Sequence, residues 1–449
     1  MPRIAGCPGT YKLQNNFVEA SGENFISGGG GANFVPVDFE VRGNHFFKPL
    51  YWNPNCATDN GCGAPGAYIG GTSVNLTDIQ RTANSVTAHF ATLPSSARVD
   101  TGTVGGAVLK IAGVSDTTLN VTLVGKITGS GPYTFTAAQI CAPNPPGTCP
   151  NTSLISSSGT VIGPAFSVQN DFEMKNGAGL LLEDNILENS WGGFSQDGYA
   201  LLLTPKNQGN ASHTGGCPQC YDSDFTVRWN VITGSADGIQ VAAVVDDFGN
   251  NAIGMERVSI HDIPIDGGFS DAASTGYGLE LTFVCGQFLN DVTFDHMSWV
   301  KVPHSWLLIG TSTGTCSPVP TFQRITFTNS IVDAGTLPAG VTNGATGCQN
   351  GVAKPHDPKP LLDACAVPYT WTDNAVSDFV NTFTWPTLLN GFTGTAGIYT
   401  NYNSGYGGDY HTTNAVCSGG TMCLKNAGTD GKDIGADISL VATETSWAQ

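Results

Sequence analysis

An eight-residue pattern of apolar and polar positions recurs along the chain. Its first, third and eighth positions are apolar, and its second and fourth are mostly polar or charged. The copies are YKLQNNFV (11–18), FEVRGNHF (39–46), LLLEDNIL (180–187), FTVRWNVI (225–232), VSIHDIPI (258–265), VTFDHMSW (292–299) and ITFTNSIV (325–332). Apolar residues at positions one and three predict a short strand whose odd positions face inward. The Asn at position six of the first four copies is expected to tolerate a left-handed turn and to hydrogen-bond neighbouring copies.

The spacing between copies indicates a solenoid. Successive copies begin 28, 141, 45, 33, 34 and 33 residues apart, and apart from the 141 this is the period of a stacked repeat. A second strand is predicted in most repeats, at ENFISG (23–28), GYALLLT (198–204), GIQVAA (238–243), YGLELTF (277–283) and SWLLIG (305–310). Such a turn is too small to bury its own apolar face, so turns must stack. Two or three strands per turn with polar corners predict an all-β fold, a right-handed parallel β-helix.

The repeats together with several longer phrases resemble the pectin-lyase-like β-helix proteins, and most closely a group of secreted bacterial β-helix repeat proteins. The phrases are YKLQNNFVEASGENFISGG, FEVRGNHFFKPL, DFEMKNGAGLLLEDNILENSW, GYALLLTPKNQ and NAGTDGKDIGADI (426–438). This resemblance implies the β-helix fold and a polysaccharide or cell-surface glycan as partner. It is specific for fold and weak for function.

The spacing of 141 predicts an inserted domain. Subtracting one ordinary turn leaves roughly 108 residues, which is the size of a small domain. Its expected strands are SVTAHFAT, GGAVLKIAG, LNVTLVGKI and PYTFTAAQ, separated by turn residues, as in a small β-sandwich or barrel. We therefore divide the chain into first turns (1–52), an inserted β domain (53–163), a main β-helix (164–425) and a tail packing on the solenoid (426–449).

Charge restricts the possible partners. Asp and Glu outnumber Lys and Arg by 36 to 18, giving a net charge of −18. A nucleic-acid partner needs clustered Lys and Arg, so this balance argues against one. No apolar run is long enough to span a membrane.

Cysteine spacing predicts disulfides and therefore an extracellular or cell-surface location. Most of the 13 cysteines have a near neighbour. The expected pairs are Cys56 with Cys62, Cys141 with Cys149, Cys217 with Cys220, Cys285 with Cys316, Cys348 with Cys365, and Cys417 with Cys423. Cys217-Pro-Gln-Cys220 also has metal-ligand spacing, but no second such motif completes a zinc site.

Position four of the repeat forms a charged column if equivalent residues stack. With the insert looped out, Arg42, Glu183 and Arg228 become neighbours, followed by His261 and Asp295. We favour an ion-pair ladder between adjacent strands. The functional interpretation is a catalytic or anion-recognising face, with Arg228 and His261 touching a uronate carboxylate.

A second, acidic column precedes the other strand of each turn. Asp197-Gly-Tyr and Asp237-Gly-Ile are expected at the same place in successive turns, with Glu23 before them and His304 after them. Two adjacent carboxylates could share a proton, as acid–base sugar chemistry needs. Asp that caps a turn beside Gly is the structural interpretation, and we favour it. Calcium is the one cofactor suggested, with Asp246 and Asp247 as ligands.

Two functions are consistent with these features. One is a secreted carbohydrate-active or carbohydrate-binding β-helix protein, either a polysaccharide lyase or a glycoside hydrolase. The other is a non-catalytic extracellular structural or adhesive protein that self-associates through its solenoid ends or inserted domain and assembles end to end into a fibre. Known β-helix hydrolase motifs are missing, and Phe294-Asp295-His296 is only a partial likeness to a lyase motif.

Overall fold

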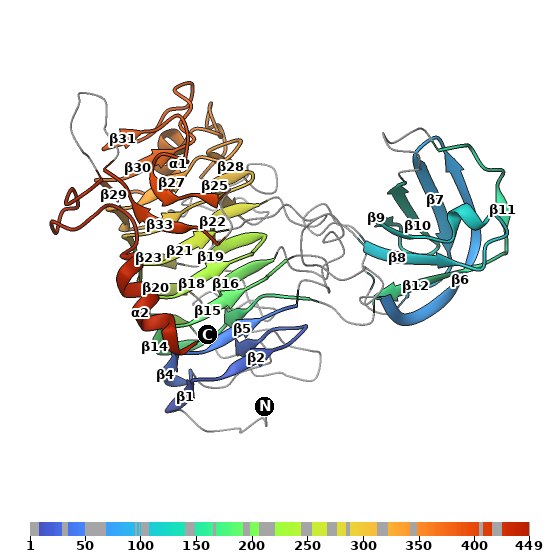
Figure 1. The fold of residues 1–449 in the computed structure, drawn as a ribbon, viewed down its shortest axis with the longest axis horizontal. Coiled ribbons are helices and arrows are strands. Elements are labelled where there is room, and N and C mark those ends of the chain that lie inside the picture. Colours follow the sequence, from blue (N-terminus) through green and yellow to red (C-terminus); the bar gives the residue numbers. More distant parts are fainter. Residues whose placement is uncertain are drawn as a thin grey trace.

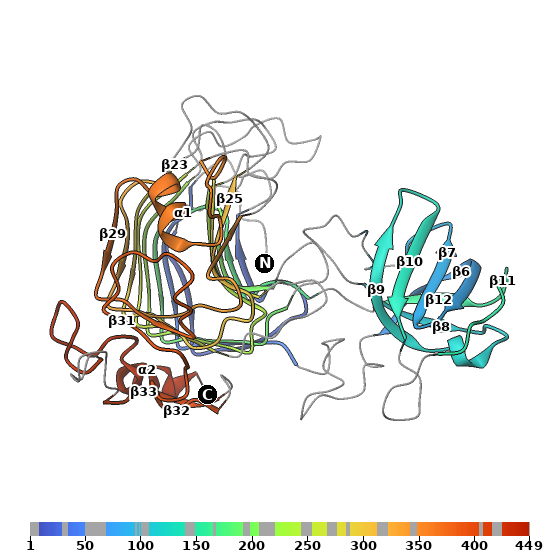
Figure 2. The same cartoon turned by 90° about the horizontal axis from the view of Figure 1, so that it is seen from above.

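The chain is a parallel β-helix with a separate inserted barrel, as seen in a computed structural model (Figures 1 and 2). The structure describes residues 9–28, 35–49, 69–94, 97, 99, 107–139, 149–164, 168–191, 198–205, 221–243, 254–266, 276–283, 288–311, 322–341, 348–403, 407–414 and 424–448. Three parallel sheets run along the solenoid, which we name sheets A, B and C. The predicted fold class, a right-handed parallel β-helix, is confirmed.

Sheet A carries positions one to four of the repeat, and its strands pair in one continuous register. Its strands are β1 (Tyr11–Gln14), β4 (Val37–Arg42), β14 (Gly177–Glu183), β17 (Asp222–Arg228), β20 (Gly254–His261), β23 (Phe288–Asp295), β26 (Ile325–Thr328) and β29 (Tyr369–Thr372). Position eight lies in sheet B. Its strands are β2 (Phe17–Glu19), β5 (His45–Phe47), β15 (Ile186–Glu188), β18 (Val231–Thr233), β21 (Pro264–Asp266), β24 (Ser298–Trp299), β27 (Ile331–Asp333), β30 (Ala375–Ser377) and β31 (Asn390–Gly391).

Sheet C contains the five second strands that we predicted, together with β13 (Phe172–Met174) and β28 (Ala339–Val341), which we did not predict. The predicted strands are β3 (Phe25–Ser27), β16 (Tyr199–Leu203), β19 (Asp237–Ala243), β22 (Tyr277–Phe283) and β25 (Ser305–Thr311). Apolar side chains from all three sheets meet in one core that runs the length of the solenoid. Leu201, Ile239 and Leu279 are stacked neighbours in this core, each 1% exposed or less. Each turn therefore buries the apolar face of the next, as the repeat spacing requires.

A ladder of asparagines, buried except for Asn16 at its first turn, runs along the corner between sheets A and B. The side-chain N–H of Asn16 donates to Asn44, that of Asn44 to Asn185, and that of Asn185 to Asn230, at 2.9, 3.0 and 2.9 Å. These residues occupy position six, and they hydrogen-bond neighbouring turns as predicted.

The left-handed residue of this corner is position five, one residue before the asparagine. Our assignment of that conformation to position six was therefore wrong. Position five has positive φ in every copy, at Asn15, Gly43, Asp184, Trp229, Asp262, His296 and Asn329. The asparagine is free for the ladder because its neighbour makes the turn.

The inserted domain is a closed antiparallel barrel. Its strands are β6 (Ile69–Thr82), β7 (Ser85–Phe90), β8 (Ala107–Ala112), β9 (Thr122–Thr128), β10 (Tyr133–Ala138) and β12 (Thr160–Pro164), with β11 (Ile155–Ser156) added beside β6 and a 3₁₀ turn, η4, at Thr117–Leu119. β6 pairs with both β7 and β12, and the pairs β12–β8–β9–β10–β7 close the ring. The barrel has its own core, which includes Ile79, Phe90 and Phe135. Of the sandwich and the barrel that we weighed, the structure is the barrel.

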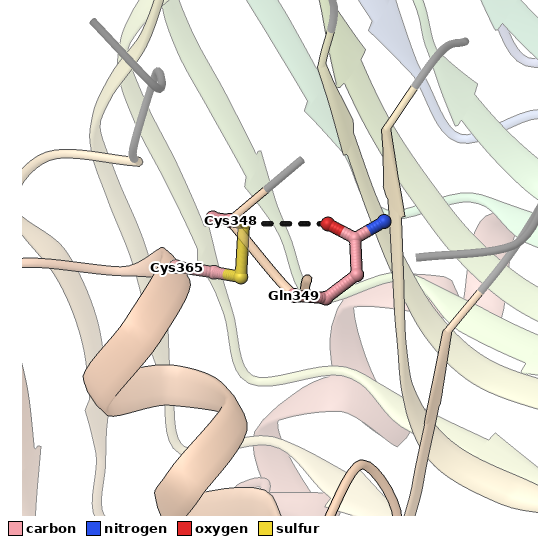
Figure 3. The surroundings of a disulfide bond; sticks show 3 residues. All are labelled: Cys348, Gln349 and Cys365. Carbon is pink, nitrogen blue, oxygen red and sulfur yellow. Dashed lines mark hydrogen bonds between the residues drawn. A yellow bond between two sulfur atoms is a disulfide. The ribbon is translucent and has the colours of Figure 1, made fainter. Parts of the chain in front are cut away.

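The last turns of the solenoid are covered by the short helix α1 (Pro358–Cys365). Leu361 and Leu362 are fully buried and join the core of the β-helix. A disulfide between Cys348 and Cys365 ties the helix down, with the side-chain oxygen of Gln349 lying 3.6 Å from the Cys348 sulfur (Figure 3). Closing a loop of this length restricts the unfolded chain, which stabilises the fold by about 3 kcal/mol.

The C-terminal segment, residues 424–448, lies along the corner between sheets A and B. It contains α2 (Ile438–Glu444) and η6 (Thr445–Trp447), and the hairpin β32 (Tyr399–Asn401) and β33 (Asp409–Thr412) packs beside it (Figure 2). Backbone N–H groups of the segment bind corner side chains turn after turn. Thr429 donates to Asn329 at 2.8 Å, Ala436 to Ser298 at 2.9 Å and Asp437 to Asp262 at 3.2 Å.

Gly435 allows this close approach. Its φ is 89°, and a Cβ there would lie 2.6 Å from the Ser298 hydroxyl. The segment therefore buries the position-five corner of several turns, including His296 at 3% exposure.

We predict that Asn185→Ala destabilises the protein by about 3 kcal/mol, because it leaves several buried backbone groups without partners. Asn185 is fully buried and donates to Asn230, to Glu183 O and to Val41 O. The measurement is urea denaturation followed by circular dichroism. Asn16→Ala, at the exposed end of the same ladder, is the matched control and should cost much less. Equal losses for the two variants would contradict a cooperative ladder.

Candidate functional site

The charged column at position four forms as the sequence pattern indicated. Arg42 pairs in register with Glu183 across the insertion, and Glu183 pairs with Arg228. Both arginines bind the same carboxylate, Arg42 Nη2 at 2.6 Å and Arg228 Nε at 2.8 Å. The Glu183 side chain is 2% exposed, so these two contacts neutralise a buried charge. The arrangement is an ion-pair ladder between adjacent strands.

The remaining residues of this column are also engaged within the protein. The guanidinium of Arg228 lies 3.9 Å over the Trp229 ring, and His261 Nδ1 lies 2.9 Å from the Asp262 carboxylate. The His261 hydrogen bond helps hold the pKa of Asp262 below its ordinary value, although burial opposes it. Asp295 accepts hydrogen bonds from Thr328 at 2.6 Å and Asn329 at 2.8 Å. A uronate at Arg228 and His261 would have to displace these partners.

The acidic column differs from our expectation. Our alignment placed Tyr199 opposite Ile239, whereas Tyr199 pairs in register with Asp237. The predicted alignment of the two carboxylates was wrong, because each Asp-Gly dipeptide begins its strand at a different offset. Asp197 itself lies outside the described residues.

Asp237 and His304 have local partners. The Asp237 carboxylate accepts the backbone N–H of Tyr277 in the next turn. His304 Nδ1 lies 3.0 Å from the Ser305 hydroxyl, and its ring lies 5.8 Å from that of Tyr277. Asp237 thus caps a neighbouring turn, which is the structural role that we favoured for it.

Only some of the predicted metal ligands and disulfide cysteines lie in the part of the chain that the structure describes. Asp246 and Asp247 lie outside them, and within the described ranges no group of three or more His, Cys, Asp or Glu is placed to hold a metal. Calcium stays a prediction. The Cys348–Cys365 pair is confirmed, and Cys149 is also disulfide-bonded. The other predicted cysteines are outside the described residues: Cys56, Cys62, Cys141, Cys217, Cys220, Cys285, Cys316, Cys417 and Cys423.

The outer face of sheet A carries a hydroxyl column at position two. Its members pair in register over five consecutive turns, and they are Thr226, Ser259, Thr293, Thr326 and Thr370. All five are at least partly exposed. Strands in a sheet are about 4.8 Å apart, so the column presents one hydroxyl at each step of that length.

A column of ion pairs borders the hydroxyl column. Arg257 binds Asp224 with two contacts of 2.6 and 2.9 Å, and Arg324 binds Asp291 with contacts of 2.5 and 2.8 Å. All four residues have positive φ and precede position one of the repeat. Between the two columns lies a shallow hollow of about 430 Å³, lined by Asp224, Phe225, Thr226, Arg257, Val258, Ser259, Asp291 and Thr293.

A carboxyl pair that we did not predict lies at the corner between sheets B and C. Glu23 and Glu173 come from turns on either side of the insertion and are within hydrogen-bonding reach of each other. Each has a buried Oε2 atom without another partner, and a proton held between the two carboxyls would satisfy both. Burial, followed by the charge of Glu173, raises the pKa of Glu23 to about 9. Lys175 lies 2.8 Å from the other Glu173 oxygen.

A buried ion pair supports the same corner. Lys48 and Asp171 are both fully buried, and their charged atoms are 3.1 Å apart. Burial raises the pKa of Asp171 to about 7, although Lys48 opposes the shift. The sequence pattern had aligned Glu23 with the acidic column, but it contained no signal for Glu173, because β13 was not predicted as a strand.

Comparison with known proteins gives little further information. No family model and no curated protein matches the chain. Among solved structures, the tailspike protein gp49 from Pseudomonas phage LKA1 aligns with 85% of this chain and 61% of its own length, at 11% sequence identity and a TM-score of 0.15. The fold assignment therefore rests on the strand registers. No helix in the described part of the chain is long and apolar enough to cross a membrane.

We predict that Glu23→Gln stabilises the protein above neutral pH. The pKa of Glu23 is higher in the folded state, at about 9, than its ordinary 4.5, so the folded state holds the proton more tightly. The free energy of unfolding therefore falls as pH rises from about 4.5 to about 9. Gln keeps a donor for Glu173 and removes that dependence, raising the melting temperature at pH 8 by about 3 °C.

The matched control is Glu19→Gln, an exposed residue of the same turn. It removes the same charge without touching Glu173. The measurement is thermal unfolding of all three proteins from pH 5 to pH 9. Parallel pH curves for wild type and Glu23→Gln would show that the two carboxyls do not share a proton.

Proposed function

We propose that this protein is a secreted carbohydrate-binding β-helix protein that holds a polysaccharide against the outer face of sheet A. The observation that carries the proposal is the hydroxyl column beside the hollow. A linear polysaccharide presents hydroxyls at a regular repeat, and a rung spacing of about 4.8 Å is comparable to the length of one sugar unit. Hydroxyls both donate and accept, so Thr226, Ser259 and Thr293 can bind sugar hydroxyls in either sense.

Charge favours a neutral polysaccharide over an acidic one. The net charge of −18 repels polyanions. Arg257 and Arg324 border the column but are each bound to an aspartate through two contacts. Breaking such a bidentate pair to bind a uronate would cost more than binding a neutral sugar beside it. The proposed partner is therefore a neutral polysaccharide, which is more specific than the polysaccharide or cell-surface glycan that the sequence suggested.

Secretion is part of the proposal. Two observations support it: the Cys348–Cys365 disulfide, which persists in an oxidising compartment, and the close spacing of most of the other cysteines along the sequence. Kinship with bacterial pectin-lyase-like proteins would fit the same interpretation. Polysaccharide cleavage, whether by a lyase or by a hydrolase, is a further proposal.

A fibre built end to end is less favoured than polysaccharide binding. Head-to-tail stacking would require the last turn to expose its core, but Leu361 and Leu362 of α1 are fully buried against that core. A partner solenoid would have to displace α1, which the Cys348–Cys365 disulfide holds in place.

We predict that replacing Thr226, Ser259 and Thr293 together by Ala weakens polysaccharide binding roughly thirtyfold. Three hydrogen bonds that jointly contribute about 2 kcal/mol correspond to that factor. The measurement is affinity electrophoresis and calorimetry with a panel of neutral and acidic polysaccharides. Reducing ends and absorbance at 235 nm are followed in parallel to detect cleavage.

The matched control replaces three threonines on the outside of the barrel, Thr87, Thr134 and Thr136, which also lie on paired strands. It should bind as wild type does. The proposal fails if no polysaccharide in the panel binds, or if the two triple variants lose the same affinity.

A further inference from the structure

Three side chains beside the solenoid form a hydrogen-bonded chain of serine, histidine and aspartate. The hydroxyl of Ser439 lies 2.8 Å from His411 Nε2. The other ring nitrogen, His411 Nδ1, lies 2.5 Å from an Asp409 carboxylate oxygen. The two nitrogens therefore face the two partners that a nucleophile–base–acid relay requires.

Two separate elements bring these residues together. Asp409 and His411 are alternate residues of β33, so their side chains lie on the same face of the strand. Ser439 is in the first turn of α2, 28 residues later. The hydrogen bonds of His411 are the largest influence on Asp409 and lower its pKa. The carboxylate stays ionised and orients the ring with Nε2 toward the serine.

Both elements are held rigidly against the β-helix. Tyr410, between the two relay residues, donates its hydroxyl to buried Asp266 at 2.5 Å. Asp437, two residues before the serine, accepts the Leu440 N–H at 3.0 Å, and its own N–H binds Asp262 at 3.2 Å. Packing thus fixes the strand and the helix independently, which is what a preorganised relay needs.

These contacts place the relay over sheet B, near the corner that sheet B shares with sheet A (Figure 2). At that corner Asp437 binds Asp262, the residue directly after His261 of the position-four column. The relay is open to solvent, with the side chains of Asp409 and His411 46% and 43% exposed. An ester group carried on a large polymer can therefore reach it.

We infer that Ser439, His411 and Asp409 form an ester-hydrolysing centre that removes short acyl groups, including O-acyl groups of a polysaccharide. The polymer-borne substrate rests on the proposed function, whereas the hydrolysis of small esters does not. Esters are favoured over amides because an alcohol is the easier leaving group. An open, solvated relay also stabilises the transition state less than a buried one does, so it suits the more reactive ester better than the amide.

The reaction balances with water as the only co-reactant. Ser439 Oγ attacks the ester carbonyl carbon while its proton passes to His411 Nε2. The C–O bond to the alcohol breaks, and the alcohol leaves with that proton, so an acyl group remains on Ser439. His411 then takes a proton from water, whose oxygen attacks the acyl carbon. The carboxylic acid leaves, and Ser439 regains its proton.

The test uses the full-length protein with p-nitrophenyl acetate as substrate and a fluorophosphonate as covalent probe. We expect label on Ser439 and hydrolysis that falls about 100-fold in Ser439→Ala and in His411→Ala, as for loss of a general base or its nucleophile. Ser446→Ala is the matched control. That serine is exposed near the end of the same segment, donates to Thr443 O, and should keep full activity.

Asp409→Asn tests positioning. Asparagine cannot hold the ring in the same tautomer, so the rate should fall while the probe still labels Ser439 slowly. Circular dichroism of each variant checks the fold. The inference is overturned if wild type takes up no probe, or if Ser439→Ala and wild type hydrolyse the ester equally. Neither readout involves a polysaccharide, so failure here is distinguishable from failure of glycan binding.

Discussion

The structure depends on the stacking of small turns, none of which can bury its own apolar face. Once stacking is imposed, side chains at equivalent positions must lie in columns about 4.8 Å apart. The asparagine ladder follows from this constraint. A buried amide donates to the next amide and to two backbone carbonyls, as Asn185 does, so neighbouring turns cannot slip without leaving several polar groups unpaired.

The same constraint explains why charged columns are poor evidence for a catalytic site in this fold. Like charges at the rung spacing repel, and opposite charges attract, so stable columns alternate in sign. Arg42, Glu183 and Arg228 alternate in this way, as do Asp224 and Arg257 on the other side of the strand. Residues so paired are not free to bind a ligand, whereas the hydroxyls between them are exposed and can exchange partners without a charge penalty. The choice of the hydroxyl column as the binding surface rests on that difference.

Periodic features were predictable from sequence, and contacts outside the period were not. The register of Arg42 with Glu183 across the insertion followed from the repeat alone, because stacking leaves only one alignment for the eight-residue pattern. Asp237 was misaligned because the Asp-Gly dipeptide marks a turn but does not fix how far before the strand it lies. Glu173 lies on a strand too short to show alternation.

The contacts of the C-terminal segment could not be predicted from the sequence, because neither β33 nor α2 belongs to the eight-residue repeat. Asp409 and His411 show only the two-residue spacing that places them on one face of a strand, and no feature of the sequence assigns Ser439 to them. Their meeting depends on packing against the solenoid, where Tyr410 binds buried Asp266 at the end of β21 and Asp437 binds buried Asp262 at the corner between sheets A and B.

In a solenoid, binding of a polymer and catalysis are best placed on different parts of the fold. Its sheets are flat and repetitive, so they can hold a repetitive polymer but cannot readily gather three different groups at one point. Chemistry that needs such convergence is more easily built where an irregular segment crosses the turns. The C-terminal segment does this at the edge of sheet A, and it is held there by backbone N–H groups that bind corner side chains in three different turns. The hydroxyl column thus lies on the regular outer face of sheet A, whereas the relay lies around the corner, over sheet B, where the irregular segments pack.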